Sequence, residues 1–308
     1  MEIDLVSSIF MQLKLNVSVQ RTFEAAGSWA IEVPRHRGIK IHSLVRGNCL
    51  IYLEGDTVPT PVKAGDSYLL PRGNAFTIAS ESSMTLAELK DQTQVQMGES
   101  HTIVNGGGDF VSNGLFFDFD SSFADILFMA LPPLIVVPGA TPQAEELVGN
   151  IRRFSSELKN TMIGKYLVLH QLAPVILLDL MRTFLSEMQG KASWFAAASE
   201  SELSKVLNLI HKSYAERWTL QTLAEATGVS RSKLAAQFKS TIGIAPMEYL
   251  CRWRMEIARD QLENQGKNLA EVAKMIGYES ESAFSASFLR VFKRRPGSFR
   301  KNKPSRGA

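Results

Sequence analysis

The stretch "TGVSRSKLAAQF" (227–238) returns in altered form as "IGYESESAFSASF" (276–288). Gly228 in the first copy corresponds to Gly277 in the second, and beyond the turn the two copies stay aligned with a constant offset. Agreement at chemically demanding positions over some 27 residues predicts one supersecondary unit that the chain uses twice.

Each copy has the pattern of two short helices joined by a tight turn. Gly228 supplies the left-handed backbone that ends a helix, and Ser230 is a good N-cap for the next one. The second helix then places Leu234, Phe238 and Ile242 on one apolar face. Two helices joined by a glycine-containing turn are the signature of a helix-turn-helix unit.

The second copy repeats this arrangement with Gly277 at the turn and Ser280 as the cap. Its predicted core is Phe284, Phe288 and Phe292. A single copy is equally compatible with a plain helical hairpin, but two copies in one basic segment favour DNA binding.

The segment between the copies, 246–264, has proline at its start and Gly266 just beyond its end, which predicts one helix. At about 1.5 Å per residue this rod is roughly 28 Å long. One turn of B-DNA is about 34 Å. A stiff helix of this length can hold two recognition helices in successive major grooves on one face of a duplex.

Charge is unevenly distributed along the chain. Residues 200–308 contain 19 Lys and Arg against 11 Asp and Glu, whereas the remainder contains 15 against 20. A basic module beside a mildly acidic one predicts a polyanion as partner of the basic part.

Three stretches, "WTLQTLAEATGVSRSKLAAQF", "GIAPMEYLCRWRMEIARDQL" and "VAKMIGYESESAFSASFLRVFKRRPGSFR", resemble the DNA-binding domain of AraC/XylS-family transcription regulators. The resemblance covers about 201–303. It implies a seven-helix domain in which a linker helix joins two helix-turn-helix units.

The candidate DNA-contacting side chains are those on the outward faces of the second helices, with their caps and the basic tail. They are Ser230, Arg231, Ser232, Lys233, Ala235, Ala236, Lys239, Ser280, Glu281, Ser282, Ser285, Ala286, Arg290, Lys293, Arg294 and Arg295.

The chain departs from the family pattern at three of these positions. Ala236 and Ala286 stand where family members commonly carry arginine, and Lys293 stands near the place of a common glycine. Alanine and serine cannot make bidentate contacts with guanine, so we expect weak guanine preference and a larger share of shape readout.

The region from Trp29 to Ser80 changes to short β-rich runs punctuated by turns. Within it, "GDSYLLPRGNAF" (65–76) resembles the second cupin motif, which we interpret as a hairpin in a small β-barrel. The predicted fold is therefore α+β with two domains: a cupin-like barrel with flanking helices, and an all-α domain with two helix-turn-helix units.

The cupin resemblance implies a metal site only where several histidines remain. Here only His42 remains, and Phe76 stands where the histidine of the second motif would be. Since a catalytic ion needs about three N or O ligands, we expect no metal and no cofactor. Phe76 instead predicts an apolar cavity for a small organic molecule, with Trp29, His42, Tyr68 and Phe76 as its candidate lining.

Two amphipathic segments follow, 143–160 and 166–188. The second is apolar nearly all round and must be buried, either against the barrel or in a dimer seam; the resemblance favours a homodimer. Its charged residues argue against a membrane span. The expected domains are 1–190 for sensing and dimerisation, 191–200 as linker, and 201–303 for DNA binding.

The leading hypothesis is a cytoplasmic transcription regulator and not an enzyme, which binds promoter DNA, responds to a small organic effector and, as an activator, contacts RNA polymerase. One alternative is a cupin enzyme with a DNA-binding tail, which would require the histidines that the motifs lack. Another is a DNA-organising protein without an effector.

Overall fold

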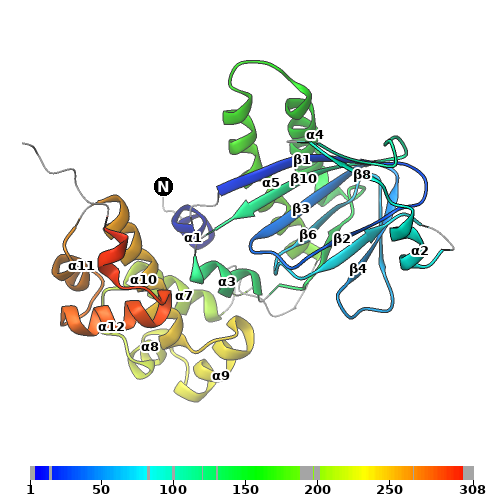
Figure 1. The fold of residues 1–308 in the computed structure, drawn as a ribbon. Helices are drawn as coiled ribbons and strands as arrows, with labels where there is room; N and C mark the ends of the chain where they lie inside the picture. The colour runs from blue at the N-terminus through cyan, green and yellow to red at the C-terminus, as the bar shows by residue number, and fades with distance from the viewer. Residues whose placement is uncertain are drawn as a thin grey trace, which may run out of the picture. The chain divides into compact units, whose positions relative to one another are not determined.

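The structure is a computed structural model that describes residues 4–13, 16–81, 84–98, 101–119, 121–129, 131–187, 197, 202–265 and 267–300. It divides into two compact units, which are considered separately (Figure 1). The β unit comprises 15–119 and 131–189, and the helical unit comprises 1–14, 120–130 and 190–308. Two segments that precede residue 190 therefore belong to the helical unit. Apart from Ala197, the expected linker 191–200 lies outside the described residues.

Two sheets form the β unit. The strands are β1 (Asn16–Ala25), β2 (Ala30–Val33), β3 (Ile39–Arg46), β4 (Asn48–Leu53), β5 (Thr60–Lys63), β6 (Ser67–Leu70), β7 (Phe76–Ala79), β8 (Val95–Met97), β9 (His101–Val104), β10 (Phe110–Asp118) and β11 (Ile135–Val137). The order in one sheet is β11-β6-β3-β10-β1-β9-β8, and in the other β2-β7-β4-β5. Buried apolar side chains from both sheets, Tyr68 and Phe76 among them, share one core between the sheets.

The expected hairpin in 65–76 is wrong. Strand β6 pairs with β3 and β11, whereas β7 pairs with β2 and β4 of the other sheet. The connection crosses between the sheets, where the amide of His36 donates a hydrogen bond to the carbonyl oxygen of Gly73 at 2.9 Å. Strands β6 and β7 therefore bury their apolar residues as members of two different sheets.

Helices α2 (Leu86–Asp91), η1 (Pro142–Ala144), α4 (Glu145–Lys159) and α5 (Lys165–Glu187) complete the β unit. Helices α4 and α5 pack on each other, and α5 also contacts β11. By length and composition alone α5 could cross a membrane, but 56% of its most apolar window is buried in the fold. A soluble core helix meets the same criteria.

The helical unit contains α1 (Leu5–Leu13), α3 (Ser122–Met129), α7 (Glu202–Lys212), α8 (Leu220–Thr227), α9 (Arg231–Ile242), α10 (Pro246–Asn264), α11 (Leu269–Met275), α12 (Glu281–Phe292) and η2 (Pro296–Phe299). Helices α8 and α9 form the first helix-turn-helix, α11 and α12 form the second, and α10 is the helix predicted between them. The Oγ atoms of Ser230 and Ser280 accept the capping hydrogen bonds from the amides of Lys233 and Ala283.

The predicted cores of the two helix-turn-helix units are confirmed, with one difference. Leu234, Phe238 and Ile242 are buried in α9, and Phe284 and Phe288 are buried in α12. The difference is the last aromatic residue of α12, at position 292, which is only half-buried. It lies at the end of its helix, next to η2.

The two recognition helices end differently. The C-cap of α9 is Gly243, with φ of 90°, and the C-cap of α12 is Lys293, with φ of 56°. Only glycine adopts this left-handed conformation at low steric cost. We therefore expect Lys293→Gly to stabilise the helical unit by about 0.5–1 kcal/mol.

Urea denaturation followed by far-ultraviolet circular dichroism will measure this change. The reciprocal variant Gly243→Lys is the matched control and should destabilise the helical unit. A Cβ at position 243 would meet no other atom, so the effect would come from the left-handed backbone alone. Equal stability of the Lys293→Gly variant and the unaltered chain would contradict the assigned cap.

Candidate nucleic-acid interface and ligand pocket

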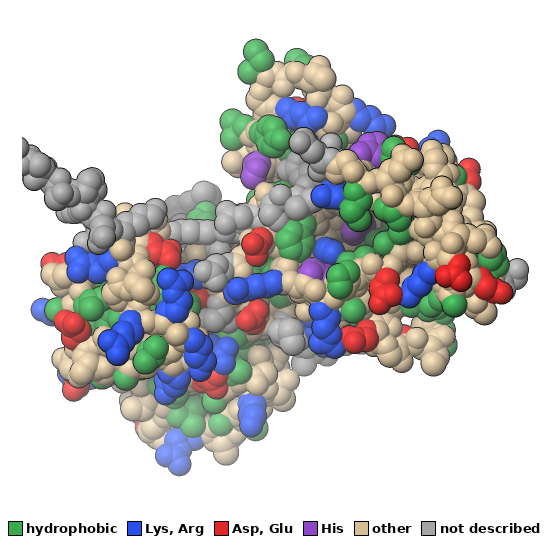
Figure 2. Space-filling model, in the orientation of Figure 1, with side chains coloured by type: hydrophobic (Ala, Val, Ile, Leu, Met, Phe, Trp, Pro, Cys, Tyr) green, Lys and Arg blue, Asp and Glu red, His purple; other side chains and the backbone are tan. Residues whose placement is uncertain are grey.

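Helices α9 and α12 present the same pattern of exposed positions. Their first ten residues show an identical order of exposed, half-buried and buried side chains. Most of the predicted DNA-contacting residues are exposed, and only Ala235 and Ser285 are half-buried. Figure 2 shows Lys and Arg side chains spread over the helical unit.

Some of these basic side chains already have partners within the helical unit. The Nζ of Lys233 lies 2.7 Å from a carboxylate oxygen of Glu202 in α7. A guanidinium nitrogen of Arg290 in α12 lies 3.3 Å from the Sγ of Cys251. Such exposed pairs are weak and can exchange for phosphate contacts.

A cluster of aromatic rings connects the linker helix α10 with α9 and with α3. The ring of Tyr249 in α10 lies 5.4 Å from the ring of Phe238 in α9, centroid to centroid. It also lies 5.0 Å from the ring of Phe123 in α3. Tyr249 of α10 thus contacts both α3 and the recognition helix α9.

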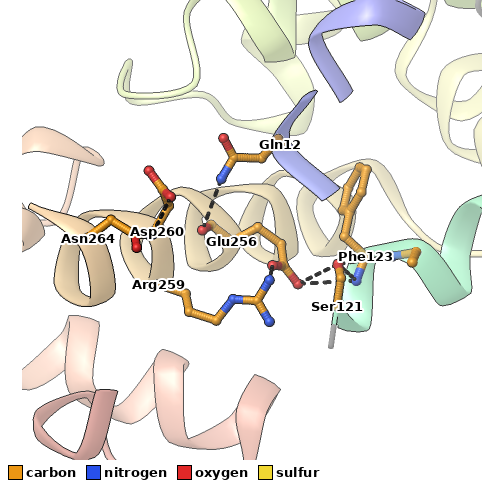
Figure 3. Close-up of polar contacts among 8 residues, drawn as sticks. Gln12, Ser121, Phe123, Glu256, Arg259, Asp260 and Asn264 are labelled. Atoms are coloured by element: carbon orange, nitrogen blue, oxygen red, sulfur yellow. Dashed lines mark hydrogen bonds and ion pairs between the residues drawn. The ribbon is translucent and has the colours of Figure 1, made fainter. Parts of the chain in front are cut away.

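A buried carboxylate holds the start of α3 against α10 (Figure 3). Oε1 of Glu256 accepts hydrogen bonds from Ser121 Oγ at 2.9 Å and from the amide of Phe123 at 3.3 Å. Its other oxygen lies 2.8 Å from the guanidinium of Arg259. Ser121 Oγ itself accepts hydrogen bonds from the amides of Phe123 and Ala124, at 3.1 and 3.2 Å. Glu256 therefore adds a negative charge at a helix N-terminus that Ser121 caps, and negative charge is stabilising there.

The β unit contains a cavity of about 710 Å³, which is in the usual range for small-molecule sites. Both sheets contribute to its lining, with Phe23, Ile31, Val33, Ile78 and Phe116 among the apolar residues.

Polar side chains also line this cavity. Burial lowers the pKa of His42 to about 3, and the charge of Lys40 adds to this shift. Burial also lowers the pKa of Lys40 and raises that of Tyr68. At neutral pH His42 and Tyr68 are therefore uncharged and able to donate hydrogen bonds.

Three of the four predicted pocket residues, His42, Tyr68 and Phe76, line the cavity. Trp29 instead packs in the core, 5.1 Å from the ring of Phe110. Sequence reasoning missed Lys40 and Arg21. The alternation of β3 carries the signal for Lys40, because residues two apart on a strand face the same side.

Among the described ranges no three His, Cys, Asp or Glu side chains form a group that could ligate a metal ion. Nε2 of His211 lies 2.8 Å from the hydroxyl of Tyr249.

Two protein-family models match this chain. Residues 4–186 match the family model described as Cupin, and residues 223–302 match the model described as Helix-turn-helix domain. A protein described as an AraC-like transcription regulator from Streptomyces antibioticus is 32% identical, over 97% of this chain and 99% of its own. The chain belongs to the AraC-like family of transcription regulators. This AraC-like protein is a DNA-binding regulator that acts on double-stranded DNA, and it is not an enzyme.

Two further proteins are similar to this chain. The HTH-type transcriptional regulator AlkR of Acinetobacter baylyi is 27% identical to this chain, over 96% of this chain and 99% of its own. Among solved structures, ToxT from Vibrio cholerae is 12% identical, with a TM-score of 0.36, and the match covers 92% of this chain and 97% of that one.

Proposed function

We propose that this regulator places α9 and α12 in successive major grooves, and that a small organic effector in the β unit controls its binding to promoter DNA. The identical exposure pattern of the two helices supports this proposal most strongly. Because each helix buries one apolar face, the opposite face is the one that remains available for DNA. The enzyme alternative has no feature of the described residues in its favour.

The chemistry of the two exposed faces favours readout of DNA shape. Ala236 and Ala286 can contact thymine methyl groups but donate nothing, and Ser232 and Ser282 each reach a single base-edge group. Arg231 and the other basic residues then contact phosphates and set the register on the duplex.

The salt dependence of DNA binding tests this interface. Full-length protein should lose affinity steeply as salt rises, because each phosphate contact changes the log–log slope by about −0.9. Arg231→Gln and Arg290→Gln should each make the slope shallower by roughly 0.9. Arg153→Gln, an exposed position on α4, is the control and should leave the slope unchanged.

Fluorescence anisotropy with a labelled duplex over a salt series will measure the slopes. A slope near zero for the unaltered protein would overturn the interface. Slopes that the α9 and α12 variants do not change would overturn the assigned faces.

The route for effector control follows the chain itself. Strand β10 lines the cavity with Gly114, Leu115 and Phe116, and it ends at Asp118. Three residues later Ser121 donates to the buried carboxylate of Glu256 on α10. We infer that a ligand that shifts β10 also changes how α3 is held on the linker helix.

Homodimerisation is part of the same proposal. Met162 and Ile163 in the α4–α5 turn, and Tyr166 and Leu167 at the start of α5, are all at least 66% exposed. Figure 2 shows hydrophobic side chains at the outer end of this hairpin. Soluble proteins rarely leave such clusters open, and a second copy would cover this one.

Leu167→Glu should therefore weaken self-association, because burial of an unpaired carboxylate is costly. Val58→Glu, at a 78% exposed loop position, is the control and should not. Sedimentation velocity over a concentration series will measure the dimer constant. A dimer that persists unchanged in Leu167→Glu would place the seam elsewhere.

The remaining parts of the proposal concern the cell. The protein acts in the cytoplasm, where its promoters are, and as an activator it would contact RNA polymerase. Transcription in vitro from a promoter found by genome-wide mapping distinguishes activation from repression.

A further inference from the structure

The cavity of the β unit has a polar end built from four adjacent strands. In the sheet register Tyr68 on β6 is paired with His42 on β3, which is paired with Gly114 on β10, which is paired with Arg21 on β1. All four residues line the cavity. The next row contributes Lys40, two residues along β3 on the same side as His42.

Glycine in the middle of this row makes room for its neighbour. A Cβ on Gly114 would lie 2.9 Å from Cε1 and 3.2 Å from Nδ1 of His42. The imidazole therefore lies over the glycine, and it stacks on Tyr68 with ring centroids 5.0 Å apart and planes 10° apart. The position of the His42 ring thus depends on the absence of a side chain at position 114.

Among the residues that the structure describes, several buried hydrogen-bonding atoms at this end have no partner. Nδ1 of His42, the hydroxyl of Tyr68 and Nε2 of His36 are buried and unsatisfied, and all three residues line the cavity. Leaving a buried polar group unpaired costs free energy comparable to a lost hydrogen bond. Three such groups on one cavity wall indicate a polar group of a ligand between them.

The charge of the lining has the sign of an anion site. Across the described parts of the chain, no carboxylate pairs with Lys40, whose Nζ lies 5.8 Å from the Phe76 ring centroid. The acidic lining residue Glu32 is already neutralised by Lys90, at 2.6 Å. Among the described residues neither Arg21 nor Lys40 forms a salt bridge, so the positive charges of both side chains lack a carboxylate partner in this part of the chain.

We propose that this cavity binds an amphipathic organic carboxylate. Lys40 and Arg21 hold its carboxylate, Tyr68 and His42 donate hydrogen bonds to the same group, and the apolar body lies against Phe23 and Phe116. The apolar majority of the lining disfavours a free phosphate or a sugar, which would leave hydroxyls unpaired against aromatic and aliphatic side chains. This inference rests on the proposed effector control and names the class of effector.

Titration calorimetry on the full-length protein tests the ligand class. The probes are decanoate, dodecanoate and 4-phenylbutyrate, each compared with its own methyl ester. We expect at least one carboxylate to bind about tenfold to a hundredfold more tightly than its ester, as charge-assisted hydrogen bonds imply. Equal affinity for acid and ester, or no binding of any acid at millimolar concentration, would overturn the proposal.

Variants connect that binding to the polar end. Lys40→Met keeps the length and apolar stem of the side chain, and it should remove the preference for the acid while leaving ester binding intact. Lys63→Met, on the exposed side of β5, is the matched control and should bind as the unaltered protein does. Unchanged acid binding in Lys40→Met would refute the anchor. Ester binding shows that the variant is folded, and where no ester binds, an unshifted thermal unfolding midpoint serves that purpose.

DNA binding in the presence and absence of the bound carboxylate separates this inference from the effector proposal. A carboxylate that binds through Lys40 without changing DNA affinity confirms the ligand class and refutes effector control by it. An ester that binds as well as the acid and changes DNA affinity refutes the ligand class but supports effector control.

Discussion

Phe288→Ala should destabilise the helical unit by about 3–5 kcal/mol, and Phe238→Ala should have a similar effect. Both side chains are fully buried in their recognition helices. The ring of Phe288 contacts three other aromatic rings, those of Phe284, Phe292 and Phe299, with centroids 4.6–5.6 Å away. Truncation removes these contacts and leaves a cavity that the short helices cannot close.

Urea denaturation followed by far-ultraviolet circular dichroism will measure the loss. Leu289→Ala, the adjacent residue on the same helix, is 43% exposed and serves as the control; it should cost much less. Specific DNA binding should fall along with stability, because the packing of the buried face of α12 positions its exposed face. A neutral Phe288→Ala would mean that the assigned core face is wrong.

Glu256→Ala should also destabilise the helical unit by about 3–5 kcal/mol. The change leaves the guanidinium of Arg259, one turn further along α10, buried without its carboxylate, since both side chains are almost inaccessible. It also removes the acceptor of Ser121 Oγ and one of two acceptors of the Phe123 amide, which donates to Ser121 Oγ as well. Breaking a buried pair costs far more than the pair contributes, because the remaining charge is uncompensated.

Two comparisons make this result specific. Glu248→Ala removes an exposed partner of Arg252 on the same helix and should cost under about 1 kcal/mol. Glu256→Gln keeps an acceptor for α3, so its loss of stability should lie between those of Glu256→Ala and Glu248→Ala. In the same proteins, a weakened response of DNA affinity to a bound carboxylate in Glu256→Gln would support α3 as the route of control. A response of full size would oppose it.

The helix-turn-helix units could be read from sequence because their signals are local. Gly228, Ser230 and the spacing of Leu234 and Phe238 specify a helix end, a cap and an apolar face within a dozen residues. The same signals correctly placed the linker helix, 246–264. The recognition residues stay predictions, since exposure shows which faces are available and not which bases they contact.

Pairing between distant strands left no comparable local signal. The segment 65–76 has the composition of a hairpin, yet its strands belong to two different sheets, because burial of each depends on partners far away in the chain. The polar end of the cavity has the same origin, since Arg21, His42, Tyr68 and Gly114 become neighbours only through the register of four strands.

The sequence by itself thus determined the fold class, the repeated unit and the basic character of the DNA-binding segment. These follow from periodicity, capping and charge, which act over a few residues. Only the tertiary structure decided that residues 120–130 join the C-terminal helices and that Glu256 accepts a hydrogen bond at the N-terminus of α3. It also decided that Lys40 lines a cavity in which no carboxylate of the described residues pairs with it. These three features depend on which buried polar and charged groups meet between segments that are distant in the chain. The spacing of residues along the sequence does not indicate those meetings.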